Sequence, residues 1–200
     1  MLIEIEGPSG AGKTTLVTSL RTDPLLATQT VIDAARLEHS TNDIGWRLGE
    51  LMRQHDHPID SIERVLLYCA RTAARARLAL SHDDEVVVLC DRLRLSLQVA
   101  TYHAGLPEAT RTQLVDLALR GIQPDLVILL DVSHPTHRRR LARRGHQSEP
   151  AGAFGRSRQL FASAFEQHAG PKSLVDTTRR TPEQVHRTVI QQLLSIRTAA

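Results

Sequence analysis

The segment Gly7-Pro8-Ser9-Gly10-Ala11-Gly12-Lys13-Thr14 fits the pattern G-x-x-x-x-G-K-[ST]. A short strand pattern, Leu2–Glu6, precedes it, and a helical pattern, Lys13–Arg21, begins inside it. Glycines in such a loop let backbone N–H groups converge on phosphate oxygens, and the helix N-terminus adds partial positive charge. This strand–loop–helix context predicts a phosphate-binding loop formed by Gly7, Ser9, Gly10, Ala11 and Gly12.

The side chains at the end of the loop indicate its ligand. Lys13 is placed to reach the β- and γ-phosphates of a nucleoside triphosphate, and the Thr14 hydroxyl to bind Mg²⁺, with Thr15 beside it. We therefore predict ATP and Mg²⁺ as cofactors. The alternative is a glycine turn that only starts a helix, although a chance match is on the order of one in a thousand. Lys13 and Lys172 are the only lysines, which strengthens the functional interpretation.

Strand-like and helix-like segments alternate along the rest of the chain. The predicted strands are Leu2–Glu6, 29–33, Val86–Cys90, Asp125–Val132 and Ser173–Asp176. The predicted helices are Lys13–Arg21, Asp43–His55, Ile59–Ser81, Ser96–His103, Pro107–Arg120, Pro135–Arg144, Arg156–His168 and Pro182–Ile196, with Thr181 as an N-cap. The unbroken apolar runs suit strands covered on both faces. We predict one α/β domain over residues 1–200, with a five-stranded, mainly parallel sheet between two layers of helices.

Composition excludes several classes of protein. The net charge of +3 suits anionic ligands, but an aromatic content of 3% is too low for the stacking platforms of single-strand nucleic-acid binders. The apolar runs are too short to cross a membrane, and the strand pattern at Leu2 leaves no room for a signal peptide. We expect a cytoplasmic protein that binds small nucleotides, not nucleic acid or membrane. Cys69 and Cys90 have no metal-site spacing, and we interpret His134 and His137 as surface residues.

Several segments beyond the loop resemble the thymidylate kinase family in matching order: IEGPSGAGKTTL, LLYCARTAARARLAL, LCDRLRLSLQ, PDLVILLDVSHPTHRRRLARRG and LVDTTRRTPEQV. The resemblance implies a P-loop NTPase-type fold and ATP-dependent phosphoryl transfer to a nucleoside monophosphate. It implies that Arg92 holds the acceptor's phosphate and that Asp91 lies beside the transferring group and its Mg²⁺. Ser96 and Gln98 follow in the same segment and are expected to contact the acceptor.

The resemblance also assigns two more arginines, Arg71 and Arg36, to the acceptor site. The resemblance implies that Arg71 contacts the acceptor's phosphate or base. The alternative is that Arg71 belongs to a solvated helix surface with Arg64, Arg75 and Arg77. Arg36 corresponds to the arginine of the family's Arg-Glu-Pro-Gly-Gly-Thr motif, which here reads RLEHST. We carry Arg36 over to the acceptor site, although the motif around it departs from that of the family.

The basic segment Arg138–Arg144 resembles the entrance to the family's mobile lid, which we place at about residues 143–158. The resemblance implies that Arg140 packs on adenine. Relatives with glycine at the Gly10 position take their catalytic arginine from the lid, and we assign that role to Arg144. The other lid arginines are Arg143, Arg156 and Arg158, and the polar stretch Gly145–Gly155 is predicted to be a loop.

Three departures from the family pattern concern the acceptor pocket. Ser9 stands where the family has Asp or Glu, Leu67 where it has the phenylalanine that stacks on thymine, and Ala100 where it has an aromatic beside the sugar. These residues predict an altered pocket whose acceptor need not be thymidylate. A homodimer formed through helices on one face of the sheet is also implied by the resemblance alone.

Two other functions remain open from the sequence. The first is a kinase acting on a nucleoside or other small hydroxyl compound, similar to deoxynucleoside kinases, which needs a general base. Glu38 is the only carboxylate the sequence suggests for that base. The second is a nucleotide-binding regulator that keeps Lys13 and Thr14 but transfers no phosphate.

Overall fold

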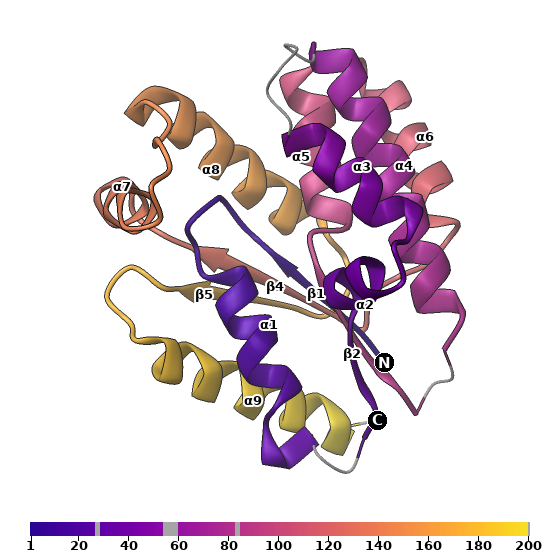
Figure 1. Cartoon of the computed structure of the whole chain (residues 1–200), viewed down its shortest axis with the longest axis vertical. Coiled ribbons are helices and arrows are strands. Elements are labelled where there is room, and N and C mark those ends of the chain that lie inside the picture. The colour runs from indigo at the N-terminus through magenta and orange to yellow at the C-terminus, as the bar shows by residue number, and fades with distance from the viewer. Residues whose placement is uncertain (27–28, 54–59, 83–84, 200) are drawn as a thin grey trace.

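A computed structural model describes residues 1–26, 29–53, 60–82 and 85–199. These residues form a five-stranded parallel sheet in the order β2-β3-β1-β4-β5 (Figure 1). The strands are β1 (Leu2–Glu6), β2 (Val31–Asp33), β3 (Val87–Asp91), β4 (Leu126–Asp131) and β5 (Lys172–Asp176). The predicted parallel α/β sheet is therefore confirmed, with each strand within about two residues of its predicted bounds.

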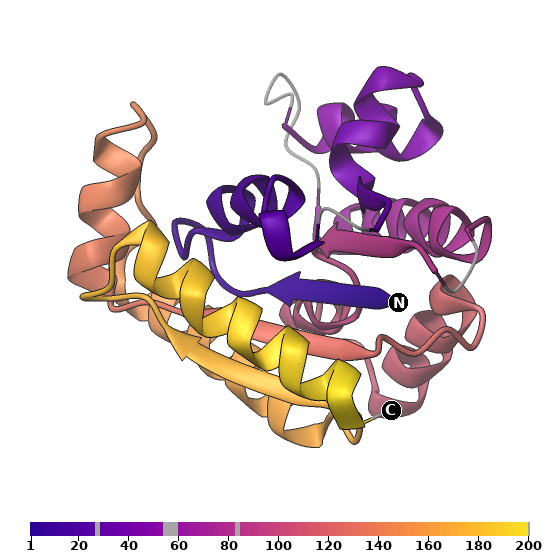
Figure 2. The same ribbon diagram turned by 90° about the horizontal axis from the view of Figure 1, so that it is seen from below.

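Helices cover both faces of this sheet (Figure 2). They are α1 (Lys13–Arg21), α2 (Ala34–Ser40), α3 (Ile44–Arg53), α4 (Ser61–Leu80), α5 (Arg94–His103), α6 (Glu108–Leu119), α7 (His134–Ala142), α8 (Ala151–Gln167) and α9 (Pro182–Ala199), with a 3-10 turn, η1, at Pro24–Leu26. Successive residues of β1 face opposite ways. Ile3 and Ile5 pack with α1 and α9, whereas Leu2 packs with α5 and α6 on the other face.

Two helical segments differ from the sequence-based prediction. α2 and η1 lie in a stretch where no helix was predicted, and the Asp33 side chain accepts a hydrogen bond from Arg36 N at the start of α2. The predicted loop Gly145–Gly155 is wrong from Ala151 onward, because α8 begins there, after Pro150. The predicted helix end at His55 and helix start at Ile59 lie outside the described residues.

The carboxyl ends of β1, β3 and β4 meet at one edge of the sheet. Parallel strands bring the segments that follow them to this edge, where α/β proteins bind ligands. The glycine-rich loop follows β1, Arg92 follows β3, and α7 follows β4 after a short connection. None of the described helices combines the length and the apolar character that crossing a bilayer requires.

Candidate active site

The glycine-rich loop between β1 and α1 has the backbone that its sequence predicts. Gly7, Gly10 and Gly12 have φ values of 135°, 72° and 104°, a region that side-chain-bearing residues rarely adopt. A Cβ at Gly7 would lie 2.2 Å from Leu130 O on the neighbouring strand. Among the described residues no side chain caps the first turn of α1, so its N–H groups remain available to an anion.

Lys13 lies beneath this loop at 6% exposure. Its Nζ donates to Gly7 O at 2.9 Å and to Pro8 O at 3.0 Å. Burial, with repulsion from Arg92, lowers the pKa of Lys13 to about 7. The ammonium is therefore destabilised until a negative ligand reaches the loop.

Thr14 and Asp91 lie together, as the sequence predicts for a Mg²⁺ site. The Thr14 hydroxyl donates to Asp91 Oδ2 at 3.0 Å, and Asp91 Oδ1 is buried without a hydrogen-bond partner in the described residues. Those residues hold no group of three or more His, Cys, Asp or Glu side chains that could bind a metal. A hydroxyl beside a carboxylate with an unpartnered oxygen fits Mg²⁺, which takes one or two protein ligands and completes its shell with water and phosphate oxygens.

A cavity of about 470 Å³ lies on one side of the loop. Its wall combines the loop and α1 with the end of α7 and the connection from β5 to α9: Gly10, Ala11, Gly12, Thr15, Leu16, Arg139, Arg140, Arg143, Arg144, Thr177, Thr178, Arg179, Arg180, Thr181, Pro182 and Val185. The predicted nucleotide residues Thr15, Arg140 and Arg144 are therefore brought together. So many arginines around one cavity favour a polyanionic ligand.

Arg140 ties this wall to the loop. Its Nη1 donates to Gly10 O at 3.0 Å and its Nη2 to Thr177 O at 2.7 Å. Partial burial, together with Arg139 and Arg144, lowers the pKa of Arg140. Its predicted stacking on adenine stays a prediction, since these bonds occupy one edge of the guanidinium and leave its faces unassigned.

A second cavity, of about 590 Å³, lies on the opposite side of the same loop. Its lining is Pro8, Ser9, Ser61, Arg64, Tyr68, Arg92, Ser96, Val99, Ala100, His103, Glu149, Ala153, Arg156, Ser157 and Phe161. Ser9, Arg92, Ser96 and Ala100, which the sequence predicts to bind the acceptor, thus belong to one lining. Arg92 Nη1 donates to Ser96 Oγ at 3.3 Å, and that hydroxyl donates to the buried Glu6 at 2.6 Å.

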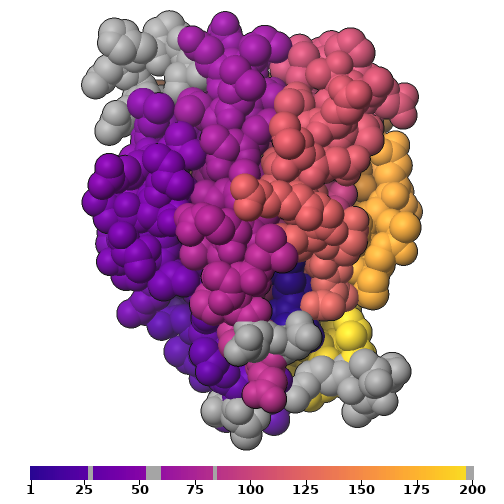
Figure 3. Space-filling view, turned by 90° about the vertical axis from the view of Figure 1, so that its right-hand side faces the viewer, coloured from indigo at the N-terminus to yellow at the C-terminus, as the bar shows by residue number. Residues whose placement is uncertain are grey.

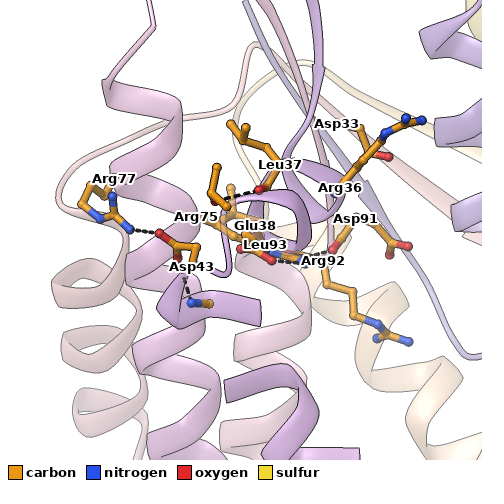
Figure 4. Close-up of polar contacts among 12 residues, drawn as sticks. Asp33, Arg36, Leu37, Glu38, Asp43, Arg75, Arg77, Asp91, Arg92 and Leu93 are labelled. Carbon is orange, nitrogen blue, oxygen red and sulfur yellow. Dashed lines mark hydrogen bonds and ion pairs between the residues drawn. The ribbon is translucent and has the colours of Figure 1, made fainter. Parts of the chain in front are cut away.

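The other residues predicted to bind the acceptor lie outside this cavity. Leu67 and Gln98 are half-buried and do not belong to this lining. The lining instead contains the aromatic residues Tyr68, one position after Leu67, and Phe161. Arg36 is exposed on α2 (Figure 4) and belongs to neither lining. The substrate roles of these three residues stay predictions without support from the geometry.

Arg71 lines a small hollow next to Arg92 and Ser96. Burial, followed by repulsion from Arg75, lowers the pKa of Arg71 to about 10. Its Nε is buried without a partner in the described residues. Arg71 is half-buried, and a guanidinium with a spare buried donor is suited to an anionic ligand, so the alternative of a fully solvated surface is wrong for Arg71. It is also wrong for Arg75, which is 1% exposed.

The predicted lid arginines are divided among three places. Arg143 and Arg144 line the first cavity, and Arg156 lines the second. Arg158 forms an ion pair with Asp131 at the end of β4. The second half of the predicted lid is helical, and Phe154 in its first turns packs 4.3 Å from the His137 ring, centroid to centroid.

Sequence reasoning missed several residues that support the site. His137 is buried, not on the surface, and its Nδ1 lies 2.8 Å from Ser9 O. Glu6 accepts hydrogen bonds from Leu93 N and Ser96 N at the start of α5. Polar or charged residues inside apolar patterns could have indicated such supporting residues, because a buried charge needs a specific partner. Their partners lie far away in sequence and could not be identified from it.

Comparison with known proteins agrees with this geometry. The family model described as thymidylate kinase matches residues 5–189. This chain belongs to the thymidylate kinase family. A thymidylate kinase of Alteromonas mediterranea is 30% identical over 94% of this chain and 86% of its own length. One from Deinococcus radiodurans is 31% identical over 92% and 91%, respectively.

A crystal structure of thymidylate kinase from Ehrlichia chaffeensis shares the fold, with a TM-score of 0.68 at 20% identity over 96% of this chain and 98% of that one. The predicted P-loop NTPase-type architecture is therefore confirmed. Thymidylate kinases are nucleoside-monophosphate kinases, and membership of the family makes this chain a phosphotransferase with nucleotide substrates.

Proposed function

We propose that the protein transfers the γ-phosphoryl group of ATP to thymidylate or a closely related nucleoside monophosphate. The observation that carries the proposal is a single phosphate-binding loop with a cavity on each side. Gly10–Gly12 face one cavity, whereas Pro8 and Ser9 face the other. Donor and acceptor bound in the two cavities would meet at the loop, as direct transfer requires.

Each side offers the chemistry that phosphoryl transfer needs. Lys13 and the loop N–H groups would hold the donor's phosphates. Arg144, which lines the first cavity, would neutralise charge on the oxygens of the transferring phosphoryl group. Thr14 and Asp91 would hold Mg²⁺, which supplies charge neutralisation to the phosphate oxygens when bound. Arg92 would hold the acceptor's phosphate, with its guanidinium oriented by Ser96.

We further propose that the acceptor pocket accepts a broader choice of sugar than the family pattern implies. Ala100 lines the cavity where the family pattern has an aromatic residue, and the smaller side chain would leave room for a 2′-hydroxyl. Ser9 offers a hydroxyl in place of a carboxylate, which exchanges a charge-assisted hydrogen bond of about 1.5–3 kcal/mol for a neutral one of about 1 kcal/mol. Tyr68 supplies an aromatic surface in the cavity despite Leu67.

The hydroxyl-kinase alternative loses the base that the sequence suggested for it. Glu38 is completely buried, and both of its carboxylate oxygens accept hydrogen bonds from Arg75. It cannot also take a proton from an attacking hydroxyl group. A monophosphate acceptor is already anionic and needs no base. The regulator alternative gives no purpose to the second cavity and its arginines.

A coupled assay of ADP release tests the proposal. Wild-type protein with ATP and Mg²⁺ is offered thymidylate, deoxyuridylate, uridylate, thymidine and no acceptor. We expect rapid turnover with thymidylate and measurable turnover with uridylate. Turnover with thymidine but not with monophosphates would support the hydroxyl kinase, and slow hydrolysis without any acceptor would support the regulator.

The protein is further proposed to act as a homodimer. Helices α3, α4 and α6 lie on one face of the molecule (Figure 3). Large apolar side chains are exposed on these helices: Ile44, Leu51, Ile62, Leu66, Leu80 and Leu117. α4 packs against both α3 and α6, so these side chains belong to neighbouring elements. Exposed apolar surface of this kind favours association with a second copy.

A further inference from the structure

Arg75 on α4 is the most voluminous of the fully buried side chains that the structure describes. Its Nε and Nη2 donate to Glu38 Oε1 and Oε2 at 2.9 and 3.2 Å. Its Nη1 donates to the backbone oxygens of Asp91 and Arg92, the latter at 2.8 Å (Figure 4). One guanidinium thus joins α2 to the backbone that carries the acceptor arginine.

The charges of Arg75 and Glu38 balance each other. An arginine cannot lose its proton in a protein, so complete burial requires a counter-ion. Burial alone would lower the pKa of Arg75, but the charge and hydrogen bonds of Glu38 outweigh it and raise that pKa. The packing around the pair is tight: a Cβ at Gly45 of α3 would lie 2.7 Å from Glu38 Oε1.

The backbone that Arg75 contacts has an unusual conformation. Arg92 has a φ of 74°, in the left-handed region that residues with side chains avoid. Its N–H donates to Ile5 O at 3.1 Å, while its carbonyl accepts from Arg75. Such a conformation persists only where surrounding contacts hold it. Here it directs the Arg92 side chain to Ser96 and the second cavity.

We propose that Arg75 is a positioning residue for phosphoryl transfer, with Glu38 as its counter-ion. It holds the left-handed turn at Arg92 so that this guanidinium faces the acceptor's phosphate. The α2 segment, which departs from the family motif as RLEHST, supplies the carboxylate for this buried contact. The inference deepens the proposed function and rests on it for the identity of the acceptor phosphate.

The chain contains a matched control. Arg77 lies on the same helix, and its Nη2 is 2.5 Å from Asp43 Oδ2. This pair also joins α4 to the α2–α3 region, but the Arg77 side chain is 50% exposed. It lies on neither cavity lining. Replacing Arg77 therefore removes a similar ion pair without touching the Arg92 backbone.

The experiment compares Arg75→Met, Arg75→Lys, Glu38→Gln and Arg77→Met, with acceptor monophosphate varied at saturating ATP. We expect Arg75→Met to lower kcat/KM for the acceptor at least about 30-fold, the size of a lost buried charge-assisted contact, while KM for ATP stays within about twofold. Arg75→Lys and Glu38→Gln, which each keep part of the network, should lose about three- to tenfold. Arg77→Met should stay within twofold.

Equal, small losses in Arg75→Met and Arg77→Met would overturn the inference and leave only a structural ion pair. If Arg75→Met fails to fold, Arg75→Lys and Glu38→Gln decide by the same split between acceptor and ATP. A wild type inactive on every monophosphate would refute the proposed function instead. The crystal structure of a folded variant then tests the positioning: an unchanged Arg92 turn overturns it, and loss of the left-handed φ supports it.

Discussion

In the free protein the ammonium group of Lys13 has a pKa near neutral pH. Its pKa of about 7 results from burial and from Arg92, and binding of a triphosphate stabilises the ammonium form. Below pH 7 the free protein already carries this proton, whereas above pH 7 it must take one up on binding. We therefore predict that affinity for Mg²⁺-ATP weakens as pH rises from 7 to 9, by at most about tenfold per pH unit.

Isothermal titration calorimetry in buffers with different ionisation enthalpies measures this uptake. At pH 8 the apparent binding enthalpy should vary with the buffer, and at pH 6 it should not. A buffer-independent enthalpy at pH 8 would show that Lys13 keeps its proton in the free protein.

Asp91 should matter for Mg²⁺ more than for stability. One of its oxygens accepts from Thr14, and the other is buried without a partner in the described residues. Asp91→Asn keeps the shape and removes the charge, so we expect kcat to fall about 10- to 100-fold and the Mg²⁺ requirement to rise. Magnesium titrations of the initial rate check this. An unchanged Mg²⁺ dependence would place the metal elsewhere.

Single residues could be predicted from the sequence where one local pattern determines their place. The loop positions and Lys13 follow from spacing alone, because the strand–loop–helix unit is contiguous. Arg92 and Ser96 could be assigned only through the family resemblance. Glu38 and Arg75 could not be paired, since 37 positions separate them and nothing local distinguishes a buried arginine from an exposed one.

Two glutamates link β1 to the N-terminus of α5. Glu4 and Glu6 are fully buried on one face of the strand, and Glu4 Oε1 accepts from Leu95 N at 3.0 Å. Burial, followed by repulsion from Glu6, raises the pKa of Glu4 well above its usual value. A raised pKa in the folded state means that stability is fully present at low pH and is lost as pH rises through that pKa.

Glu4→Gln should therefore stabilise the protein increasingly with pH, because an amide imitates the protonated acid without titrating. We expect Tm to rise by about 2–4 °C at pH 8, equivalent to about 1 kcal/mol, with little difference at pH 5. Calorimetric scans of both proteins from pH 5 to 8 provide the measurement. A Tm difference between the two proteins that does not change from pH 5 to pH 8 would contradict a raised pKa for Glu4.

The segment between α7 and α8 should respond to nucleotide. Arg143 and Arg144 are exposed at the mouth of the first cavity, and we propose that they close over ATP. A non-hydrolysable ATP analogue should then slow tryptic cleavage after Arg144 at least about fivefold, because a closed segment must open locally before trypsin can cut it. Cleavage after Arg120, which is exposed at the end of α6 and belongs to neither cavity lining, is the internal control.

Mass spectrometry of timed digests measures both bonds together. Equal slowing at Arg120 and Arg144 would indicate general stabilisation, and no slowing at Arg144 would contradict lid closure.

Helices and strands were predictable where their own periodicity is strong. The strands of the sheet centre are continuous apolar runs, and the long helices repeat every three to four residues. α2 is only seven residues long and depends on Asp33 and its buried Glu38. The start of α8 contains Gly152 and Gly155, which disfavour a helix, yet Phe154 packs on His137 and the tertiary contact prevails.

The whole molecule should associate through the face that contains α4 and α6. Leu117 on α6 is 76% exposed and Leu66 on α4 is 56% exposed. Glutamate at either position would place a charge in an apolar interface, so Leu117→Glu and Leu66→Glu should shift the protein from twice the 22.2 kDa chain mass to the monomer mass. Light scattering coupled to size-exclusion chromatography measures this change.

Leu174→Glu on the edge strand β5 is the control, since this leucine is 58% exposed but lies on a different element. It should leave the mass unchanged. A wild type that already elutes at the monomer mass would contradict the proposed dimer.

The strand order also affects how a new chain leaves the ribosome. β1 is made first but lies at the centre, and its partners β3 and β4 follow much later. The amino group of Met1 donates to Val86 O across 85 positions. At about 5–20 residues per second, translation needs roughly 4–17 s to supply that partner. During this interval the strand has no sheet to join, which makes nascent chains natural clients for chaperones and makes early termination products prone to aggregate.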